Sequence, residues 1–299
     1  MMDFHFEQLR AFVAAVDHGT FESAARELMV TPSAISQRIK ALEQSVGRVL
    51  LLRTKPITIT ASGEIVLRLG RAVHLLGHDA ALELHADDAL TPATPAVIPI
   101  VVNADSLATW LLPVLADVAA RESVVFDLAR EDQDHSTDLL RAGSVMAAVT
   151  SNAEPVQGCT VRPLGRMRYR PMASPAFAAR WFEDGATAQA LTAAPVVVFD
   201  RKDDLQDAYL RRRGVDPADP PRHHVPASAD FATAVGLGLG WGMLPDAQSD
   251  APLRRGDLVV LDETGGVDVP LFWQQWRLHS RLLELVTTAV VDAARSTLH

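Results

Sequence analysis

The sequence predicts an α/β protein that begins with a small, separate, all-α domain. Apolar residues recur at helical spacing over residues 6–46, a long helical pattern covers residues 61–85, and strands alternate with helices after residue 96. Such alternation favours parallel sheets. A chain of 299 residues is long enough for two or three domains with cores of their own.

The first sixty residues read as three short helices followed by two short strands. Residues 6–18 form the first helix, and Thr20 or Ser23 can cap the second. Met29, Val30 and Thr31 form a turn. Thr31 then caps a third helix, with Pro32 at its first position, where a missing N–H costs nothing. Extended pieces at 49–52 and 57–59 enclose a basic tip, which is typical of a winged helix-turn-helix.

Polar side chains gather on the early exposed face of the third helix, the part that a helix-turn-helix presents to the major groove. Gln37 suits adenine, and Arg38 suits guanine or a phosphate. Serines and a helix N-terminus suit phosphates. The alternative is an ordinary solvated helix face. The predicted DNA-binding residues are Thr31, Pro32, Ser33, Ser36, Gln37, Arg38, Lys40, Arg53 and Lys55.

The charge distribution separates the two ends of the chain. The net charge is -9, yet residues 1–60 hold seven Lys and Arg against six Asp and Glu. Residues 32–60 contain five basic residues and one acidic residue, Glu43. This local positive excess lies where phosphates would need it, whereas the acidic remainder suggests a domain with another task.

Other features bound the class of protein. No apolar run is long enough for a membrane helix, and the N-terminus lacks the pattern of a signal peptide, so a cytoplasmic protein is expected. Cys159 is the single cysteine and is expected to be a small buried residue. Neither a nucleophile motif nor metal-ligand spacing is present, which argues against an enzyme and against zinc. The G-x-G-x-G-x-G run at 236–242 is expected to be a tight turn rather than a dinucleotide loop.

The pattern from Ala61 to His85 predicts one long helix with a heptad seam. A long helix with such a seam is expected to pair with a second copy, giving a homodimer; packing on its own domain is the alternative. Residues 86–96 contain two prolines and form a linker. The seam consists of Val66, Leu69, Val73, Leu76 and Ala80.

The remainder alternates strands with helices. Strands are expected at 97–102, 124–129, 145–149, 168–173, 196–199, 223–227, 257–261 and 270–276, and helices at 106–121, 134–142, 203–213, 229–238 and 280–297.

An ordered set of residues forms a signature in the N-terminal domain: Leu9, Phe12, Val16, Gly19-Thr20-Phe21, Ala24-Ala25, Leu28, the run Thr31 to Ser36, Ile39, Leu42-Glu43, Gly47, Leu50-Leu51, Arg53, Thr60 and Gly63. This set resembles the signature of LysR-type transcriptional regulators. One departure is Leu51, where that family usually has Phe, which changes packing under the wing.

Further runs resemble the LysG/ArgP subgroup of that family: 102–110, 131–135, 158–159, 238–245 and 272–276. The resemblance implies that the protein senses lysine, arginine or histidine and activates a gene for amino-acid export. It also implies a two-lobed effector domain like a periplasmic binding protein, with no cofactor. The expected domains are 1–60 for DNA, 61–90 for the linker helix and hinge, and 91–299 for the effector, divided into lobe I at 91–170 and 268–299 and lobe II at 171–267.

Candidate effector-binding residues follow predicted strands or open helices. Backbone amides and Ser106 could receive an α-carboxylate, and a cationic side chain needs a carboxylate, for which Asp105 and Glu131 are favoured. A carboxylate at a strand end is also a common helix cap. Trp110 lies in a subgroup-like run, although tryptophans 110, 241, 273 and 276 are more typical of a core. The candidates are Asn103, Ala104, Asp105, Ser106, Trp110, Glu131, Asp132, Thr150, Asp200, Ser228 and Asp230.

Promoter DNA, a small-molecule effector and a second copy of the chain are the expected partners; a tetramer and contact with RNA polymerase stay open. A LysR-type regulator with another effector is the first alternative. A binding protein or enzyme with an incidental helical domain is the second.

Overall fold

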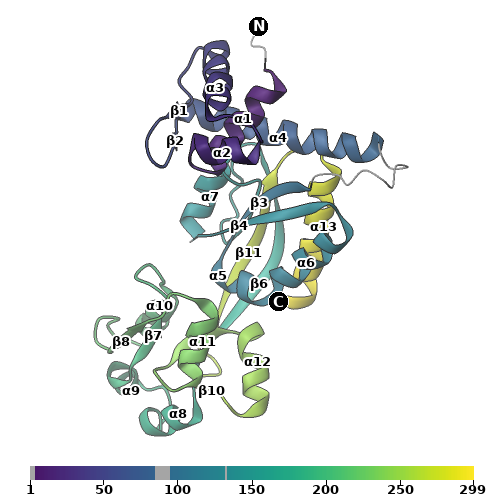
Figure 1. The fold of residues 1–299 in the computed structure, drawn as a ribbon. Helices are drawn as coiled ribbons and strands as arrows, with labels where there is room; N and C mark the ends of the chain where they lie inside the picture. The colour runs from purple at the N-terminus through teal and green to yellow at the C-terminus, as the bar shows by residue number, and fades with distance from the viewer. Residues whose placement is uncertain (1–3, 85–94, 132) are drawn as a thin grey trace. The chain divides into compact units, whose positions relative to one another are not determined.

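The computed structural model describes residues 4–84, 95–131 and 133–299 (Figure 1). They form two compact units. Unit 1 comprises residues 1–102, 116–161 and 273–289, and unit 2 comprises residues 103–115, 162–272 and 290–299. None of the helices in these ranges has both the length and the apolar character needed to cross a membrane.

Unit 1 begins with the three expected helices, α1 (Phe6–Asp17), α2 (Phe21–Glu27) and α3 (Pro32–Val46). The hydroxyl of Thr20 accepts a hydrogen bond from the Ser23 amide at 3.1 Å, so Thr20, not Ser23, caps α2. Thr31 caps α3 in the same way, through the Ala34 amide at 3.2 Å. Local capping chemistry therefore determines where these helices begin.

The wing is a two-stranded antiparallel sheet of β1 (Leu51–Leu52) and β2 (Thr58–Ile59). It packs on the first turn of α4 (Ala61–Leu84), where a Cβ at Gly63 would lie 2.3 Å from the carbonyl oxygen of Leu50. A glycine is therefore required for this approach. Apolar side chains from α1 to α4 and from the wing close one core, with Phe12, Ile35 and Leu42 fully buried.

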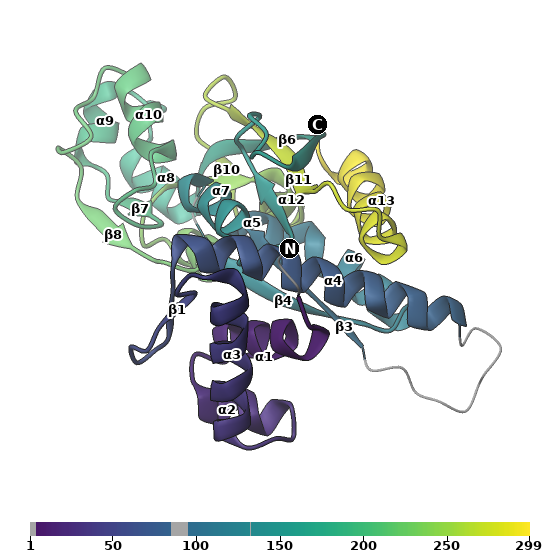
Figure 2. The same cartoon turned by 90° about the horizontal axis from the view of Figure 1, so that it is seen from above.

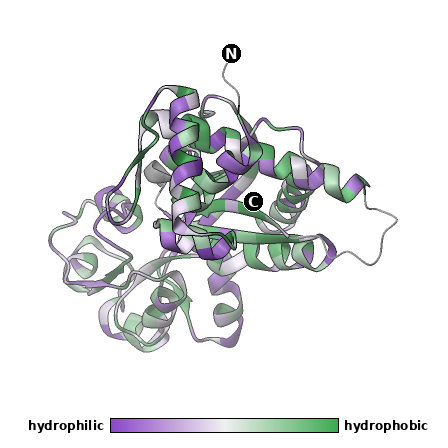
Figure 3. Cartoon of the chain, turned by 45° about the horizontal axis from the view of Figure 1, so that its top comes forward, coloured by the Kyte–Doolittle hydropathy of each residue, from purple (hydrophilic) through white to green (hydrophobic). Residues whose placement is uncertain are grey.

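The heptad seam of α4 divides into two parts. Val66 is buried in the core of the helix-turn-helix and Val73 packs against that core, as the alternative interpretation expected. Leu76 and Ala80, further along, are exposed. Figure 3 shows hydrophobic and hydrophilic bands alternating along this helix, the longest in the chain's first hundred residues.

The rest of unit 1 contains a parallel sheet. β3 (Ala96–Val102) pairs with β4 (Val124–Arg130) and with β5 (Ala147–Thr150), all in parallel. The helix α7 (Gln133–Ala142) connects β4 to β5 (Figure 2). This α/β arrangement is what the alternation of elements predicts.

Four elements have residues in both units: α6 (Leu112–Arg121), β6 (Cys159–Ala173), β11 (Val267–Trp276) and α13 (Arg281–Thr297). In the part of β11 within unit 1, Gln274 is fully buried. Its amide donates to the carbonyls of Asn152 and Glu154 at 2.9 Å each and accepts from the Val156 amide at 3.1 Å. One side chain thus fixes the loop that follows β5.

Unit 2 has mixed pairing rather than parallel sheets throughout, which corrects the expectation. β7 (Val196–Val198) and β8 (Arg222–His224) are parallel, but β6 pairs antiparallel with β9 (Gly242–Pro245) and β10 (Val259–Val260). The long strand β6 runs in the opposite direction to β9 and β10. The expectation was wrong because the periodicity of apolar residues does not reveal strand direction. The other helices among the described residues are α5 (Ala104–Ser106), the π-helical turn η1 (Leu107–Leu111), α8 (Pro175–Trp181), α9 (Ala188–Ala193), α10 (Leu205–Arg212), α11 (Ser228–Gly236) and α12 (Asp246–Arg255).

Three of these helices were missed from the sequence: α8, α9 and α12. The first two have seven and six residues, too few for a periodic pattern, although Ser174 and Thr187 cap them. α12 contains Pro252, which disguises it. The glycine run at 236–242 is, as expected, a turn between α11 and β9.

Candidate DNA-binding and effector-binding sites

The outward face of α3 carries most of the predicted DNA-binding side chains. Ile35 and Ile39 are buried beneath it, and this anchors the opposite face toward solvent. The hydroxyls of Thr31 and Ser33 lie 2.9 Å apart at the start of the helix. Ser36 is half-buried, and the exposed members of the set on α3 are Pro32, Ser33, Gln37 and Lys40.

Arg38 has a partner that the sequence did not suggest. Its guanidinium lies 3.1 Å from a carboxylate oxygen of Glu7 on α1. A base or phosphate would therefore have to replace Glu7, so Arg38 is less available than Gln37 or Lys40. The pair is partly exposed, and such pairs are weak enough to exchange.

The wing tip is basic and internally braced. Arg53 is exposed and lies 5.7 Å from the ring centre of Phe21, and Lys55 is exposed. The Thr54 hydroxyl donates to the carbonyl of Pro56 at 2.7 Å. Glu43, the acidic residue within 32–60, accepts from the backbone amides that open the wing, Leu50 at 2.8 Å and Leu51 at 3.4 Å. This role of Glu43 leaves no trace in the sequence pattern, because a contact between α3 and the wing has no helical periodicity.

Unit 2 gathers polar side chains around Asp105. The Tyr169 hydroxyl and the Ser228 hydroxyl each donate to this carboxylate at 2.6 Å. The Gln248 amide donates to the Ser228 hydroxyl at 2.6 Å. The cluster thus joins the start of α5, the middle of β6, the start of α11 and the first turn of α12.

Burial controls the ionisation of this cluster. It raises the pKa of Tyr169 well above its usual value, and the adjacent Asp105 raises it further, so the phenol stays a hydrogen-bond donor. Burial also raises the pKa of Asp203, against the lowering effect of hydrogen bonds from the Leu205 and Phe199 amides. A neighbouring negative charge on Asp105 acts in the same direction as burial.

Three buried polar atoms near the start of α5 have no hydrogen-bond partner among the described residues. They are the side-chain oxygens of Asn103 and Ser106 and the indole nitrogen of Trp110. Ser106 is fully buried and Trp110 is 5% exposed. A buried polar group without a partner costs free energy, and functional sites are where proteins retain such groups.

The remaining candidates are not brought into this cluster. Thr150 is buried in unit 1 and accepts from the Asn152 amide at 3.2 Å. Asp200 accepts from the amides of Lys202 at 2.7 Å and Asp203 at 3.0 Å, so it is a turn-forming cap. Glu131 and Asp230 are exposed, Ala104 is half-buried, and Asp132 lies outside the described residues.

Tyr169 and Gln248 were not predicted to belong to a site. Tyr169 lies within a strand rather than at its end, and Gln248 belongs to a helix that was not expected. The one available signal was that tyrosine occurs only twice in the chain.

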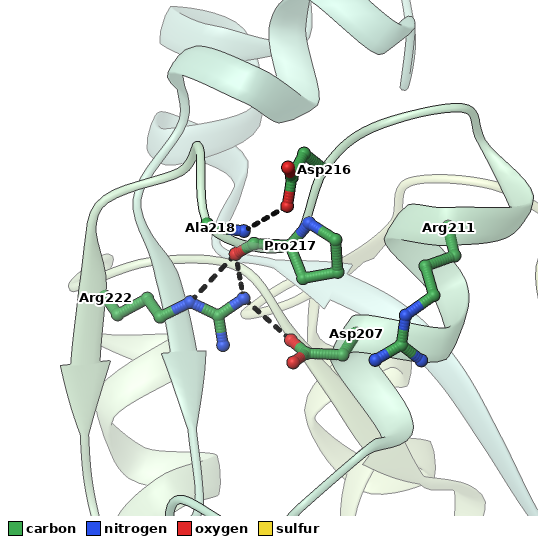
Figure 4. A pocket seen from close by; sticks show the side chains of 6 residues that line it. All are labelled: Asp207, Arg211, Asp216, Pro217, Ala218 and Arg222. Carbon is green, nitrogen blue, oxygen red and sulfur yellow. Dashed lines mark hydrogen bonds and ion pairs between the residues drawn. The ribbon is translucent and has the colours of Figure 1, made fainter.

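A separate surface hollow of about 420 Å³ lies between α10 and β8 (Figure 4). Both arginines that line it are paired: Arg222 binds Asp207 of the same wall at 2.7 Å, and Arg211 binds Asp204 outside it at 2.9 Å. Among the described residues no group of three or more His, Cys, Asp or Glu is placed to hold a metal ion. The Asp105 cluster therefore remains the stronger candidate for the effector site.

A winged helix-turn-helix joined through α4 to an α/β domain with a buried polar cluster defines a DNA-binding regulator with a ligand-binding domain. Residues 6–64 match the model of bacterial regulatory helix-turn-helix proteins of the LysR family, and residues 97–295 match the LysR substrate-binding domain. The chain belongs to the LysR family of transcriptional regulators. It is a regulator, not an enzyme.

Within the family the chain groups with LysG and ArgP proteins. It is 47% identical over 292 residues to the lysine export transcriptional regulatory protein LysG of Corynebacterium efficiens, covering 97% of this chain and 98% of that protein. It matches the crystal structure of ArgP from Mycobacterium tuberculosis with a TM-score of 0.83 and 43% identity over 99% of both chains. Full-length LysG from Corynebacterium glutamicum with the effector Arg bound matches with a TM-score of 0.76 and 39% identity, over 99% of this chain and 100% of that one.

Proposed function

We propose that this regulator senses lysine, arginine or histidine and activates a gene for an amino-acid exporter. The names of its relatives support the proposal, since one is called a regulator of lysine export and another was solved with arginine bound. Residues 1–60 would bind promoter DNA, residues 61–90 would link and dimerise, and residues 91–299 would hold the effector.

The observation that carries the proposal is the position of Asp105. An ionised carboxylate has about four acceptor positions, and the hydroxyls of Tyr169 and Ser228 use two of them. The others suit the ammonium of lysine, the guanidinium of arginine or a protonated imidazole. Because Tyr169 and Ser228 hold the carboxylate in place, little freedom is lost when a cation binds.

The unpartnered atoms beside Asp105 support an amino acid rather than a simple cation. The buried hydroxyl of Ser106 could donate to an α-carboxylate, and the Asn103 side-chain oxygen could accept from an α-ammonium. A ligand that satisfied both atoms would remove the desolvation cost that they impose in the free protein.

Calorimetry with lysine, arginine, histidine and glutamine tests the effector. We expect heat of binding with one or more of the basic amino acids and none with glutamine. Asp105→Asn should weaken binding by about 10- to 100-fold, as expected for a lost charge-assisted pair. Asp230→Asn is the matched control, because it removes an exposed carboxylate of the same unit. Equal or absent responses to all four ligands would instead favour a LysR-type regulator with another effector.

Binding to its own upstream DNA tests the other half of the proposal. The exposed Leu76 and Ala80 support pairing of α4 with a second copy, so a homodimer on a partly palindromic site is expected. Gel shift and light scattering at micromolar protein should show a specific complex with two or four copies. A monomer with no specific complex would contradict both expectations. A pull-down with RNA polymerase tests the contact with that enzyme that the sequence leaves open.

A further inference from the structure

The effector-domain part of unit 1 contacts the linker helix α4 through α7 and β3. The more extensive contact joins the C-terminal end of α7 to the first half of α4 (Figures 1 and 2). The guanidinium of Arg68 on α4 donates to the carbonyl of Arg141 at 2.6 Å. Arg141 belongs to the last turn of α7, where carbonyls lack helical partners and attract a cation. Arg68 thus caps a helix of another segment.

Gly143 allows α7 and α4 to approach more closely than a residue with a side chain at this position would permit. Its φ of +79° is the left-handed conformation of a helix-ending glycine. A Cβ at this position would lie 2.4 Å from Cγ of Arg68, 3.2 Å from the Arg68 amide nitrogen and 3.3 Å from the Glu64 carbonyl oxygen. The backbone at Gly143 therefore lies directly on α4, and any other residue would push the two helices apart.

On its other side, α4 is firmly attached to the helix-turn-helix. A Cβ at Gly70 would lie 2.7 Å from Cγ2 of Val13 in α1. Arg71, only 9% exposed, forms an ion pair with Asp17 at the end of α1. Gly63 lies under the wing, as described above. A shift of α4 near Arg68 is therefore transmitted to α1 and the wing through close packing.

α7 is packed against the sheet of unit 1. Ten residues give it a length of about 15 Å. It starts just beyond β4, where the chain carries the candidate Glu131, and it packs on β5, which ends at the candidate Thr150. The indole of Trp276 donates to the carbonyl of Leu140 at 3.4 Å and fixes the last turn. α7 also contacts β3, whose last residue directly precedes the segment with Asn103 and Asp105 of the proposed effector site.

We propose that α7 couples effector binding to DNA binding through the contact of Gly143 and Arg68 with α4. The inference rests on the proposed function, and it names Gly143 and Arg68 as positioning residues that touch neither the DNA nor the effector. Binding of the effector at the start of α5, which directly follows β3, shifts α7 against α4, and α4 moves the wing and α3. By linkage, DNA must then change effector affinity by the same factor.

The test measures that factor in the full-length protein. Effector affinity is measured by calorimetry with and without operator DNA, for the wild type, Gly143→Ala and Arg68→Ala. Coupling in regulatory proteins is typically about 5- to 150-fold. We expect both substitutions to reduce the factor at least five-fold, toward 1, while effector affinity without DNA stays within about two-fold of the wild type.

Gly256→Ala is the matched control. Gly256 also ends a helix at positive φ, +78°, but a Cβ there would have nothing within 4 Å. It therefore carries the same backbone strain without displacing a neighbour, and its coupling factor should equal that of the wild type. Arg68→Ala keeps the test valid if Gly143→Ala fails to fold, because Arg68 is a surface side chain.

The outcomes separate the two proposals. In one outcome, the wild type binds basic amino acids, DNA changes their affinity, and both variants show the same coupling factor as the wild type. This outcome overturns the coupling role of Gly143 and Arg68 but not the proposed function. A wild type that binds none of the three amino acids overturns the proposed function, and the coupling inference falls with it. Loss of coupling in Gly256→Ala as well would show that general strain, not the α4 contact, is responsible.

Discussion

The helix-turn-helix and the Asp105 cluster are built from contacts of different range. In the first, Thr20 and Thr31 cap helices through amides three residues away. In the second, Asp105 binds side chains that are 64 and 123 residues away in the chain. The difference teaches that a DNA-reading surface can be specified by short sequence patterns, whereas a ligand site is assembled by the tertiary fold.

The largest expected loss of stability comes from a change in the close local packing of the N-terminal domain. Alanine normally stabilises a helix relative to glycine by about 1 kcal/mol, but at Gly63 its Cβ would meet the Leu50 carbonyl at 2.3 Å. Overpacking should win, and Gly63→Ala should lose about 2–3 kcal/mol in urea unfolding. Gly236→Ala, with nothing within 4 Å, should change stability by less than about 1 kcal/mol. Equal effects would contradict the packing argument.

A slightly smaller effect should appear where long-range contacts dominate. Gln274→Leu keeps the bulk of the side chain but leaves two carbonyls and one amide of the loop after β5 without partners. Solvation of the loosened loop will recover part of the loss, so we expect about 2 kcal/mol, measured by thermal unfolding. The exposed Gln157, in the same stretch of chain, provides the control: Gln157→Leu should stay within about 0.5 kcal/mol.

DNA affinity separates base reading from charge on α3. Gln37→Ala should cost about 1–3 kcal/mol on the operator and little on unrelated DNA, because it removes a base contact. Lys40→Ala should weaken both complexes alike and lower the slope of log affinity against log salt by about 1. Fluorescence anisotropy at several salt concentrations measures both. If the two variants behaved identically, α3 would not lie in the major groove as proposed.

The smallest effect concerns Met29, which occupies the helix-turn-helix turn with a φ of +53°. Its side chain is 91% exposed and contributes little packing. Met29→Gly should relieve the left-handed strain and stabilise the domain by about 1 kcal/mol. Met29→Ala removes nearly the same side chain but keeps the Cβ, so it should leave the melting temperature unchanged. A gain with alanine equal to that with glycine would refute strain as the cause.

The sequence was most informative where structure is local. Pro32 and the caps predicted α3, and the apolar spacing predicted α1, α4 and α13. The left-handed Met29 and the Glu7–Arg38 pair escaped notice, because neither leaves a trace in periodicity. In the α/β part most strand positions followed from apolar runs, but β9, the first half of β6 and the antiparallel direction of β6 did not. Of the effector candidates, Asp105 and Ser228 meet in one cluster, whereas Asp200 is used in a turn. Tyr169 and Gln248 join them only because β6 and α12 fold back onto α5.

The engagement of Glu43 by the wing has a consequence for how the protein searches a chromosome. The Leu50 and Leu51 amides bind one of its oxygens, so the single acid among residues 32–60 is held by the backbone beside five basic residues. The remaining chain, residues 61–299, carries 31 acidic and 21 basic residues. DNA, a polyanion, repels this acidic part of the protein and attracts the basic segment of residues 32–60. Electrostatic attraction therefore favours encounters in which that segment faces the DNA. We therefore expect short, correctly oriented encounters and weak binding to random DNA. Added salt screens the attraction and should lower the rate of association.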